Sequence, residues 1–146
     1  ESSSPDVVYA YTATEDDILT VSLCGEGSDY DTKVYVFEND QNTFASTAGG
    51  DEACSDDDCS NSSTNYLSII NSLEVTAGNT YYIVVDGYAG QSGSYQLSVF
   101  RDEVTNVVVF ENNEPNTALL KNFIISFSIF FVIYIYFYSL PICIKI

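Results

Sequence analysis

An acidic loop carries the residues with the clearest chemical potential in the sequence. Three aspartates stand in a row in ACSDDDCS, residues 53–60, and Asp31 closes the upstream run GSDYD. Carboxylate oxygens are ligands that Ca²⁺ prefers, and this ion takes about six to eight oxygens at once. Asp31, Asp56 and Asp57 are therefore the best candidate ligands for a calcium ion.

The acidic loop has a second interpretation that needs no metal. It does not follow the EF-hand pattern, because no D-x-D-x-D-G run has a Glu at its twelfth position. Exposed neighbouring carboxylates repel one another by about 1 kcal/mol or less per pair in water, and salt screens this repulsion. A solvated turn could therefore carry all three aspartates.

Cysteine pairing decides how the loop is held. Disulfides persist in oxidising compartments, and Cys24, Cys54 and Cys59 all precede the apolar end of the chain. Four residues separate Cys54 from Cys59, which is compatible with a local disulfide that stiffens the loop, and this is the pairing we expect. The alternative joins Cys24 to either loop cysteine and would pin the loop to the sheet.

One N-glycosylation sequon, Asn61-Ser62-Ser63, begins two residues after Cys59. It falls in a polar loop of a domain that we expect to be secreted, so Asn61 is a candidate glycosylation site. Triplets of this kind also arise by chance.

Residues suited to catalysis are scarce. The chain has no His, so it can build neither a Ser-His nor a Cys-His pair. The runs GQSG and GEGSD lack the Lys and the following helix of a phosphate-binding loop. The carboxylates crowd one loop instead of lining a cleft, so we do not expect an enzyme.

Charge divides the chain into two parts. All 21 acidic residues and two basic ones fall within residues 1–116, so this part carries 2 − 21 = −19 charges. Such a surface repels phosphate backbones and anionic lipid, which argues against nucleic-acid binding and makes cations natural partners.

Alternation typical of β-strands dominates residues 6–100. Apolar residues recur at every second position in runs such as DVVYAYTAT, ILTVSLC and TYYIVVDG, and turn-forming residues separate them in AGNT and YAGQSG. TNVVVF, at 105–110, is expected to form a last strand. The pattern predicts an all-β fold, an antiparallel β-sandwich over residues 1–110.

A polar linker, residues 111–122, leads to a long apolar segment. Residues 123–144 contain no charge, and a helix of that length spans about 33 Å, against about 30 Å of hydrocarbon in a bilayer. Most of them are Ile, Phe, Val or Leu, and together these favour insertion by about 6 kcal/mol. We expect a C-terminal transmembrane helix, a single pass that leaves the acidic domain at the cell surface.

Two other accounts of the apolar segment remain open. A glycolipid-anchor signal also ends a chain with an apolar run, although NNEPN upstream fits the cleavage rule poorly. The segment could also be a mistranslated gene end, because its residues are favoured by AT-rich codons. The protein would then be glycolipid-anchored or secreted. The polar start ESSSP is not a signal peptide, so we expect a longer precursor.

The order of these motifs resembles a known family. DVVYAYTAT, LTVSLCGEGSDYDTKVYVFE, ACSDDDC and LEVTAGNTYYIVVDGYAGQSGSYQLSVF are together similar to the bacterial pre-peptidase C-terminal (PPC) domain, in its cysteine-containing extracellular form. The resemblance covers residues 6–100 and implies a non-catalytic jelly-roll β-sandwich, related in fold to collagen-binding modules, some of which use calcium. Relatives often carry another cysteine where this chain has FENDQNTF, and a membrane span behind the domain is not a general family feature.

Two functions follow as expectations. In the first, the chain is a non-catalytic extracellular binding or structural module, tethered to a membrane and supported by calcium. It would contact a glycan, a protein or another copy of itself through its sheet faces and loops. In the second, the domain is a C-terminal accessory to a secreted hydrolase such as a peptidase, and assists folding, secretion or substrate capture.

Overall fold

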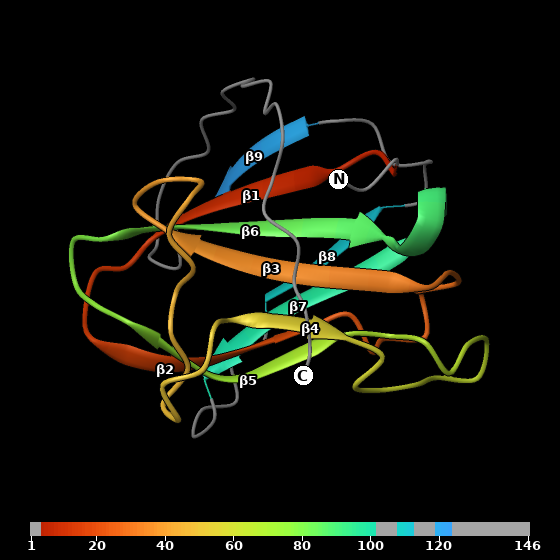
Figure 1. Cartoon of the computed structure of the whole chain (residues 1–146), viewed down its shortest axis with the longest axis horizontal. Helices are drawn as coiled ribbons and strands as arrows, with labels where there is room; N and C mark the ends of the chain where they lie inside the picture. Colours follow the sequence, from red (N-terminus) through yellow and green to blue (C-terminus); the bar gives the residue numbers. More distant parts are fainter. Residues whose placement is uncertain (1–3, 102–107, 113–118, 124–146) are drawn as a thin grey trace.

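Two β-sheets form the body of the protein in the computed structural model, which describes residues 4–101, 108–112 and 119–123 (Figure 1). Sheet A has the strand order β4-β3-β6-β1-β9, and sheet B has the order β5-β2-β7-β8. The strands are β1 (Val7–Thr12), β2 (Asp17–Ser22), β3 (Thr32–Glu38), β4 (Cys54–Asp56), β5 (Ile69–Val75), β6 (Thr80–Gly87), β7 (Tyr95–Arg101), β8 (Val108–Asn112) and β9 (Leu119–Phe123). Among these described strands, neighbours pair antiparallel except β1 and β9, which are parallel. The predicted all-β fold is confirmed.

The main core lies between the two sheets. Alternate residues of the strands point into it, as the period of two predicts. Its buried members from sheet A are Val7, Tyr9, Tyr11, Val34, Val36, Tyr81, Ile83 and Val85, and those from sheet B are Leu19, Val21, Ile70, Leu73, Val75, Tyr95, Leu97 and Val99. Burial of each large apolar side chain contributes roughly 1.5–3 kcal/mol, so this layer is the main source of stability.

A second apolar cluster lies on the opposite face of sheet A. Its members are Val8, Tyr35, Phe37 and Val84, and each is 5% exposed or less. They alternate with the inward-facing residues of β1, β3 and β6, so they point away from sheet B. Phe44 stacks on Phe37 with ring centroids 4.7 Å apart. Sheet A therefore buries apolar side chains on both faces.

The C-terminal part of the described structure corrects one boundary. The sequence suggests a polar linker over 111–122, but β8 continues to Asn112 and Leu119–Phe123 forms β9 beside β1. Backbone groups along the edge of a sheet gain hydrogen-bond partners from such a strand. Hydropathy does not measure the stabilisation by these backbone hydrogen bonds. The polar composition of the segment therefore gave no indication of a strand.

The predicted membrane span, residues 123–144, lies outside the described residues apart from Phe123, which ends β9. Within the part of the chain that the structure describes, no helix combines the length and apolarity needed to cross a bilayer. The last strand predicted at 105–110 is confirmed from Val108 onward.

Candidate functional site

Pairing between β3 and β4 assembles the predicted cation ligands. Asp31 immediately precedes β3, and Asp56 ends β4 in register with Lys33. Asp57 follows with a φ of 64°, a left-handed conformation that Asp tolerates better than most residues. One carboxylate oxygen from each of the three aspartates lies within 4.8 Å of the others. The structure thus brings together the three residues that the sequence singled out.

Two oxygens of this aspartate cluster lack partners. Oδ1 of Asp31 and Oδ1 of Asp56 are buried, and neither has a hydrogen-bond partner in the described part of the protein. Burial raises the pKa of Asp31, the charges of Asp57 and then Asp56 raise it further, and Lys33 opposes them. Because an unpaired buried carboxylate oxygen is unfavourable, the residues present fit a bound cation.

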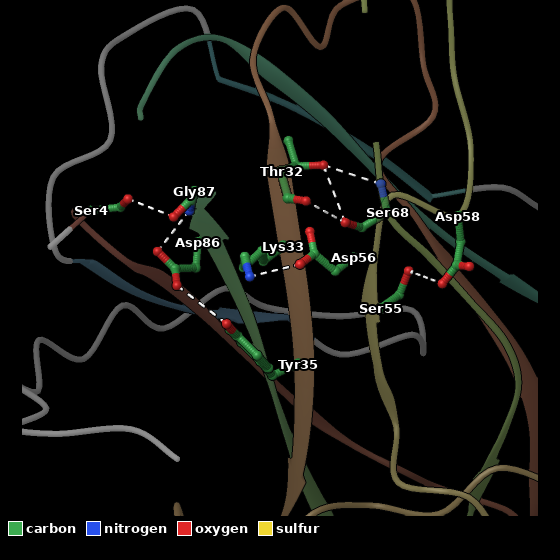
Figure 2. Close-up of polar contacts among 10 residues, drawn as sticks. All are labelled: Ser4, Thr32, Lys33, Tyr35, Ser55, Asp56, Asp58, Ser68, Asp86 and Gly87. Carbon is green, nitrogen blue, oxygen red and sulfur yellow. Dashed lines mark hydrogen bonds and ion pairs between the residues drawn. The ribbon is translucent and has the colours of Figure 1, made fainter. Parts of the chain in front are cut away.

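Lys33 supplies a positive charge at the side of the aspartate cluster. Its Nζ lies 2.7 Å from Oδ2 of Asp56 (Figure 2) and 5.0 Å from the centre of the Tyr88 ring. Three carboxylates and one ammonium group leave two negative charges, which one divalent cation would balance. Sequence reasoning missed Lys33. Its rarity was the available signal, because it is one of two basic residues within residues 1–116 and stands two positions after Asp31.

The third aspartate of the run organises the loop. Oδ2 of Asp58 accepts a hydrogen bond from Oγ of Ser55 at 2.8 Å (Figure 2). The same Ser55 oxygen accepts the N–H of Ile69 at 2.9 Å, at the start of β5. Asp58 therefore stabilises the hydroxyl that connects the loop to sheet B, a different role from that of its two neighbours.

Two exposed tyrosines contact the backbone at Asp31 and Thr32. The N–H of Tyr88 donates to the carbonyl of Asp31, and the N–H of Thr32 donates to the carbonyl of Tyr66, both at 3.0 Å. The Tyr88 side chain is 51% exposed and that of Tyr66 is 54% exposed. Aromatic residues are enriched in binding surfaces, so the cluster and its two tyrosines form a candidate contact surface.

A disulfide joins Cys24 to Cys59, whose Cα atoms are 5.9 Å apart. This finding corrects the expected Cys54–Cys59 pairing, and it matches the alternative in which Cys24 pins the acidic loop to the sheet. The bond indicates an oxidising compartment, because cytosolic thiols are kept reduced.

Contacts of the chain around residues 67 and 68 explain the pairing. Cys59 forms an isolated β-bridge with Leu67, and the N–H of Leu23 donates to the carbonyl of Ser68 at 2.9 Å. Leu67 and Ser68 are adjacent in the chain, and so are Leu23 and Cys24. These two contacts therefore bring Cys24 and Cys59 together. Cys54 instead lies within β4, where pairing with β3 sets its position.

Asn61, the predicted glycosylation site, is a structural residue of the loop. Its Nδ2 donates to the carbonyls of Gly25 at 2.7 Å and Ser28 at 2.8 Å. Its Oδ1 accepts the N–H groups of Ser63 at 2.8 Å and Thr64 at 3.0 Å. Because a glycan would replace one of the two Nδ2 hydrogens, glycosylation would remove at least one of these bonds.

Comparisons with known proteins give no relative. No family model matches the chain, and no curated protein or solved structure matches it either. The geometry of the aspartate cluster and its surroundings is therefore the basis for a functional proposal.

Proposed function

We propose that the chain is a non-catalytic extracellular module, tethered to a membrane by residues 123–144, whose β-sandwich binds a calcium ion through Asp31, Asp56 and Asp57. The observation that supports the ion is the meeting of three carboxylates, two of which have a buried oxygen without a hydrogen-bond partner among the described residues. An all-oxygen ligand set in a chain without His suits calcium better than a transition metal.

The ion would act as a structural link at the edge of sheet A. β4 is an edge strand of three residues, so it offers few backbone hydrogen bonds to β3. A cation held by Asp31 before β3 and by Asp56 and Asp57 at the end of β4 would fasten the two strands. Since the unfolded chain lacks the site, calcium at about 100 times its Kd would stabilise the fold by roughly 2.7 kcal/mol.

The location and the tether rest on two separate features. The Cys24–Cys59 bond supports an oxidising, extracellular setting. The uncharged apolar run at 123–144 supports insertion into a bilayer. The jelly-roll topology and the relation to PPC domains are part of the same proposal, and the quoted motifs support them.

The contact surface around the aspartate cluster would serve ligand binding. Tyr66 and Tyr88 have exposed side chains, and their backbones hydrogen-bond to those of Thr32 and Asp31. Tyrosine rings stack against the apolar faces of sugars, and a glycan is the ligand class that we propose, with a protein or a second copy of the chain as alternatives. No catalytic step is assigned to the surface.

Thermal unfolding of the full chain in detergent micelles tests the calcium site. Asp57→Asn removes one charge and keeps a residue that tolerates positive φ, whereas Asp51→Asn removes an exposed charge elsewhere. We expect saturating calcium, compared with chelator, to raise Tm by at least about 4 °C in the wild type and in Asp51→Asn. The shift should vanish in Asp57→Asn. Equal melting of the wild type in calcium and chelator would refute the ion.

Membrane extraction tests the tether. Native membranes are washed at alkaline pH, and the intact mass of the protein is measured. A retained span predicts that the protein stays in the pellet with residues 123–144 included in its mass. A protein in the supernatant, or a mass that ends near residue 116, would contradict the tether and leave the calcium site untouched.

A further inference from the structure

The two strands beside the aspartate cluster, β3 and β4, separate next to it. They pair as far as Lys33 and Asp56, the last pair of their register on the side of the cluster. Beyond that pair, residues 67–69 form hydrogen bonds to both separated segments. This segment, the wedge, ends with Ile69, the first residue of β5 in sheet B. The wedge therefore links the two halves of the aspartate cluster to each other and to the second sheet.

Ser68, the middle residue of the wedge, holds the segment that carries Asp31. Its N–H donates to Oγ1 of Thr32 at 3.1 Å, and its hydroxyl donates to the carbonyl of Thr32 (Figure 2). The N–H of Thr32 donates in turn to the carbonyl of Tyr66 at 3.0 Å. Ser68 and Thr32 are both 0% exposed, so bonds to water would not replace these bonds if they broke. The backbone at Asp31 is therefore fixed by its neighbour in the chain.

The other two wedge residues hold segment 55–59, which carries the other two aspartates of the cluster. The N–H of Ile69 donates to Oγ of Ser55 at 2.9 Å, and Ser55 is 2% exposed. Leu67 exchanges two backbone hydrogen bonds with Cys59, at 2.8 Å and 3.0 Å. Both ends of the segment are thus bonded to the wedge.

The division of these bonds between the two sides follows from extended backbone. Successive residues of a strand direct their N–H and C=O groups to opposite edges, so Ser68 faces one segment while Leu67 and Ile69 face the other. One carboxylate oxygen from each of the three aspartates lies within 4.8 Å of the others. The backbone of the wedge maintains the separation of the two segments from which these carboxylates extend.

We propose that Ser68 is a positioning residue for the aspartate cluster, because it fixes Asp31 relative to the segment 55–59 that carries the other two carboxylates. The importance of this role for calcium rests on the proposed function. Carboxylates that are already in place need little ordering when an ion arrives, and such ordering would otherwise reduce the affinity. Loss of the Ser68 hydroxyl would loosen Thr32, and Asp31 would then have to be ordered by the ion itself.

Calorimetric titration of the full chain in detergent micelles with calcium tests the effect on affinity. Ser68→Ala should raise the Kd for calcium about tenfold or more, because a bond that orders one ligand is lost. Tyr9→Phe is the matched control, since it also removes a hydroxyl from a buried hydrogen bond, the contact with Tyr95 in the core, and should keep the wild-type Kd.

A second pair of variants separates the hydrogen bond from the shape of the side chain. Thr32→Val removes the oxygen that accepts the Ser68 N–H and should also raise the Kd, whereas Thr32→Ser keeps that oxygen and should bind calcium as the wild type does. If calcium binds the wild type and Ser68→Ala with equal Kd, or if Tyr9→Phe shows the same increase, the positioning role is overturned.

Amide hydrogen exchange in chelator tests the positioning without the ion. Ser68→Ala should speed exchange of the Thr32 and Cys59 amides about tenfold, because the wedge holds both segments together. The amides of β1, whose strand partners are β6 and β9, should exchange as in the wild type. Faster exchange at Thr32 alone, or at neither amide, would overturn the proposal. A wild type that binds no calcium would refute the proposed ion, and the exchange result would still decide whether Ser68 holds the two segments together.

Discussion

The hydroxyl groups of Tyr9 and Tyr95 lie 2.8 Å apart in the core, one from sheet A and the other from sheet B. Both side chains are 1% exposed. Burial raises the pKa of Tyr9 to about 12, although the hydrogen bond to Tyr95 opposes this effect. The two sheets are thus joined by a polar contact within an apolar layer, and the Tyr9 phenol stays neutral across the physiological pH range.

Removal of one hydroxyl from this pair should destabilise the fold. We expect Tyr9→Phe to lower the free energy of unfolding by about 1 kcal/mol, because one partner of a buried hydrogen bond is lost while the ring remains. Urea unfolding measures the change. Tyr66→Phe, at an exposed ring, is the control and should be neutral. If both variants lowered the free energy of unfolding equally, the buried hydrogen bond would not explain the loss.

The disulfide should contribute more than any single hydrogen bond. Cys24 and Cys59 are 35 residues apart, and the chain-entropy relation for a loop of this length gives about 4 kcal/mol. We expect the Cys24→Ser, Cys59→Ser double variant to lose stability of this order in urea unfolding.

Peptide mapping checks the disulfide connectivity. A protease that cleaves before Asp separates Cys54 from Cys59 under non-reducing conditions, so the linked peptides identify the partner of Cys59. A Cys54–Cys59 link would contradict the structure.

The side-chain amide of Asn61 should stabilise the fold as a hydrogen-bond donor and should not carry a glycan. Asn61→Asp keeps the acceptor oxygen but loses both donors to the carbonyls of Gly25 and Ser28, so we expect a loss of about 2 kcal/mol. Ser63→Ala destroys the sequon without changing Asn61 and should leave stability unchanged. A mass shift between the wild type and Ser63→Ala beyond the substitution itself would reveal a glycan and count against the structural role.

The Asp31→Asn variant should separate the cost of ionising Asp31 in the folded protein from the stabilisation by the proposed calcium ion. The raised pKa of Asp31 means that its ionisation opposes folding, a penalty that grows as pH rises through the raised value. In chelator at neutral pH, Asp31→Asn should therefore be as stable as the wild type or more so. In calcium it should lose the stabilisation. A variant that is less stable in chelator, or that keeps the calcium shift, would argue against this account.

Gly87 should resist even the smallest side chain. Its backbone is extended, with φ of −126°, so no conformational strain is involved. A Cβ there would overlap the carbonyl oxygen of Gln91 and lie 2.9 Å from its carbon. We expect Gly87→Ala to cost about 1–3 kcal/mol, whereas Gly49→Ala, which meets two side-chain oxygens at 3.4 Å and 3.8 Å, should be nearly neutral. Chemical unfolding of both variants measures the difference, and similar values would contradict the steric argument.

Local patterns made the strands and the aspartate cluster predictable. The alternation around Val7, Tyr9 and Tyr11 depends on the strand period alone, and these residues enter the core as expected. Asp31, Asp56 and Asp57 could be chosen because acidic residues near a turn are visible without knowledge of the fold. Their proximity follows from the pairing of β3 with β4, which the sequence leaves unspecified.

Features that depend on tertiary contacts could not be predicted. The partner of Cys59 is decided by where residues 67 and 68 lie, a contact between distant segments. Val7 and Val85 are 78 positions apart, and their pairing depends on one register between β1 and β6. β9 was missed for the same reason, because its partner β1 is at the other end of the chain.

The Cys24–Cys59 disulfide also has a consequence for the proposed calcium site. Cys59 stands two residues after Asp57, so the bond to Cys24 restricts the segment that presents this carboxylate. A reductant would release that segment, and each calcium ion captured afterwards would have to immobilise it again. The redox conditions around the protein would in this way set the strength of the proposed ion binding without any change in the aspartates themselves.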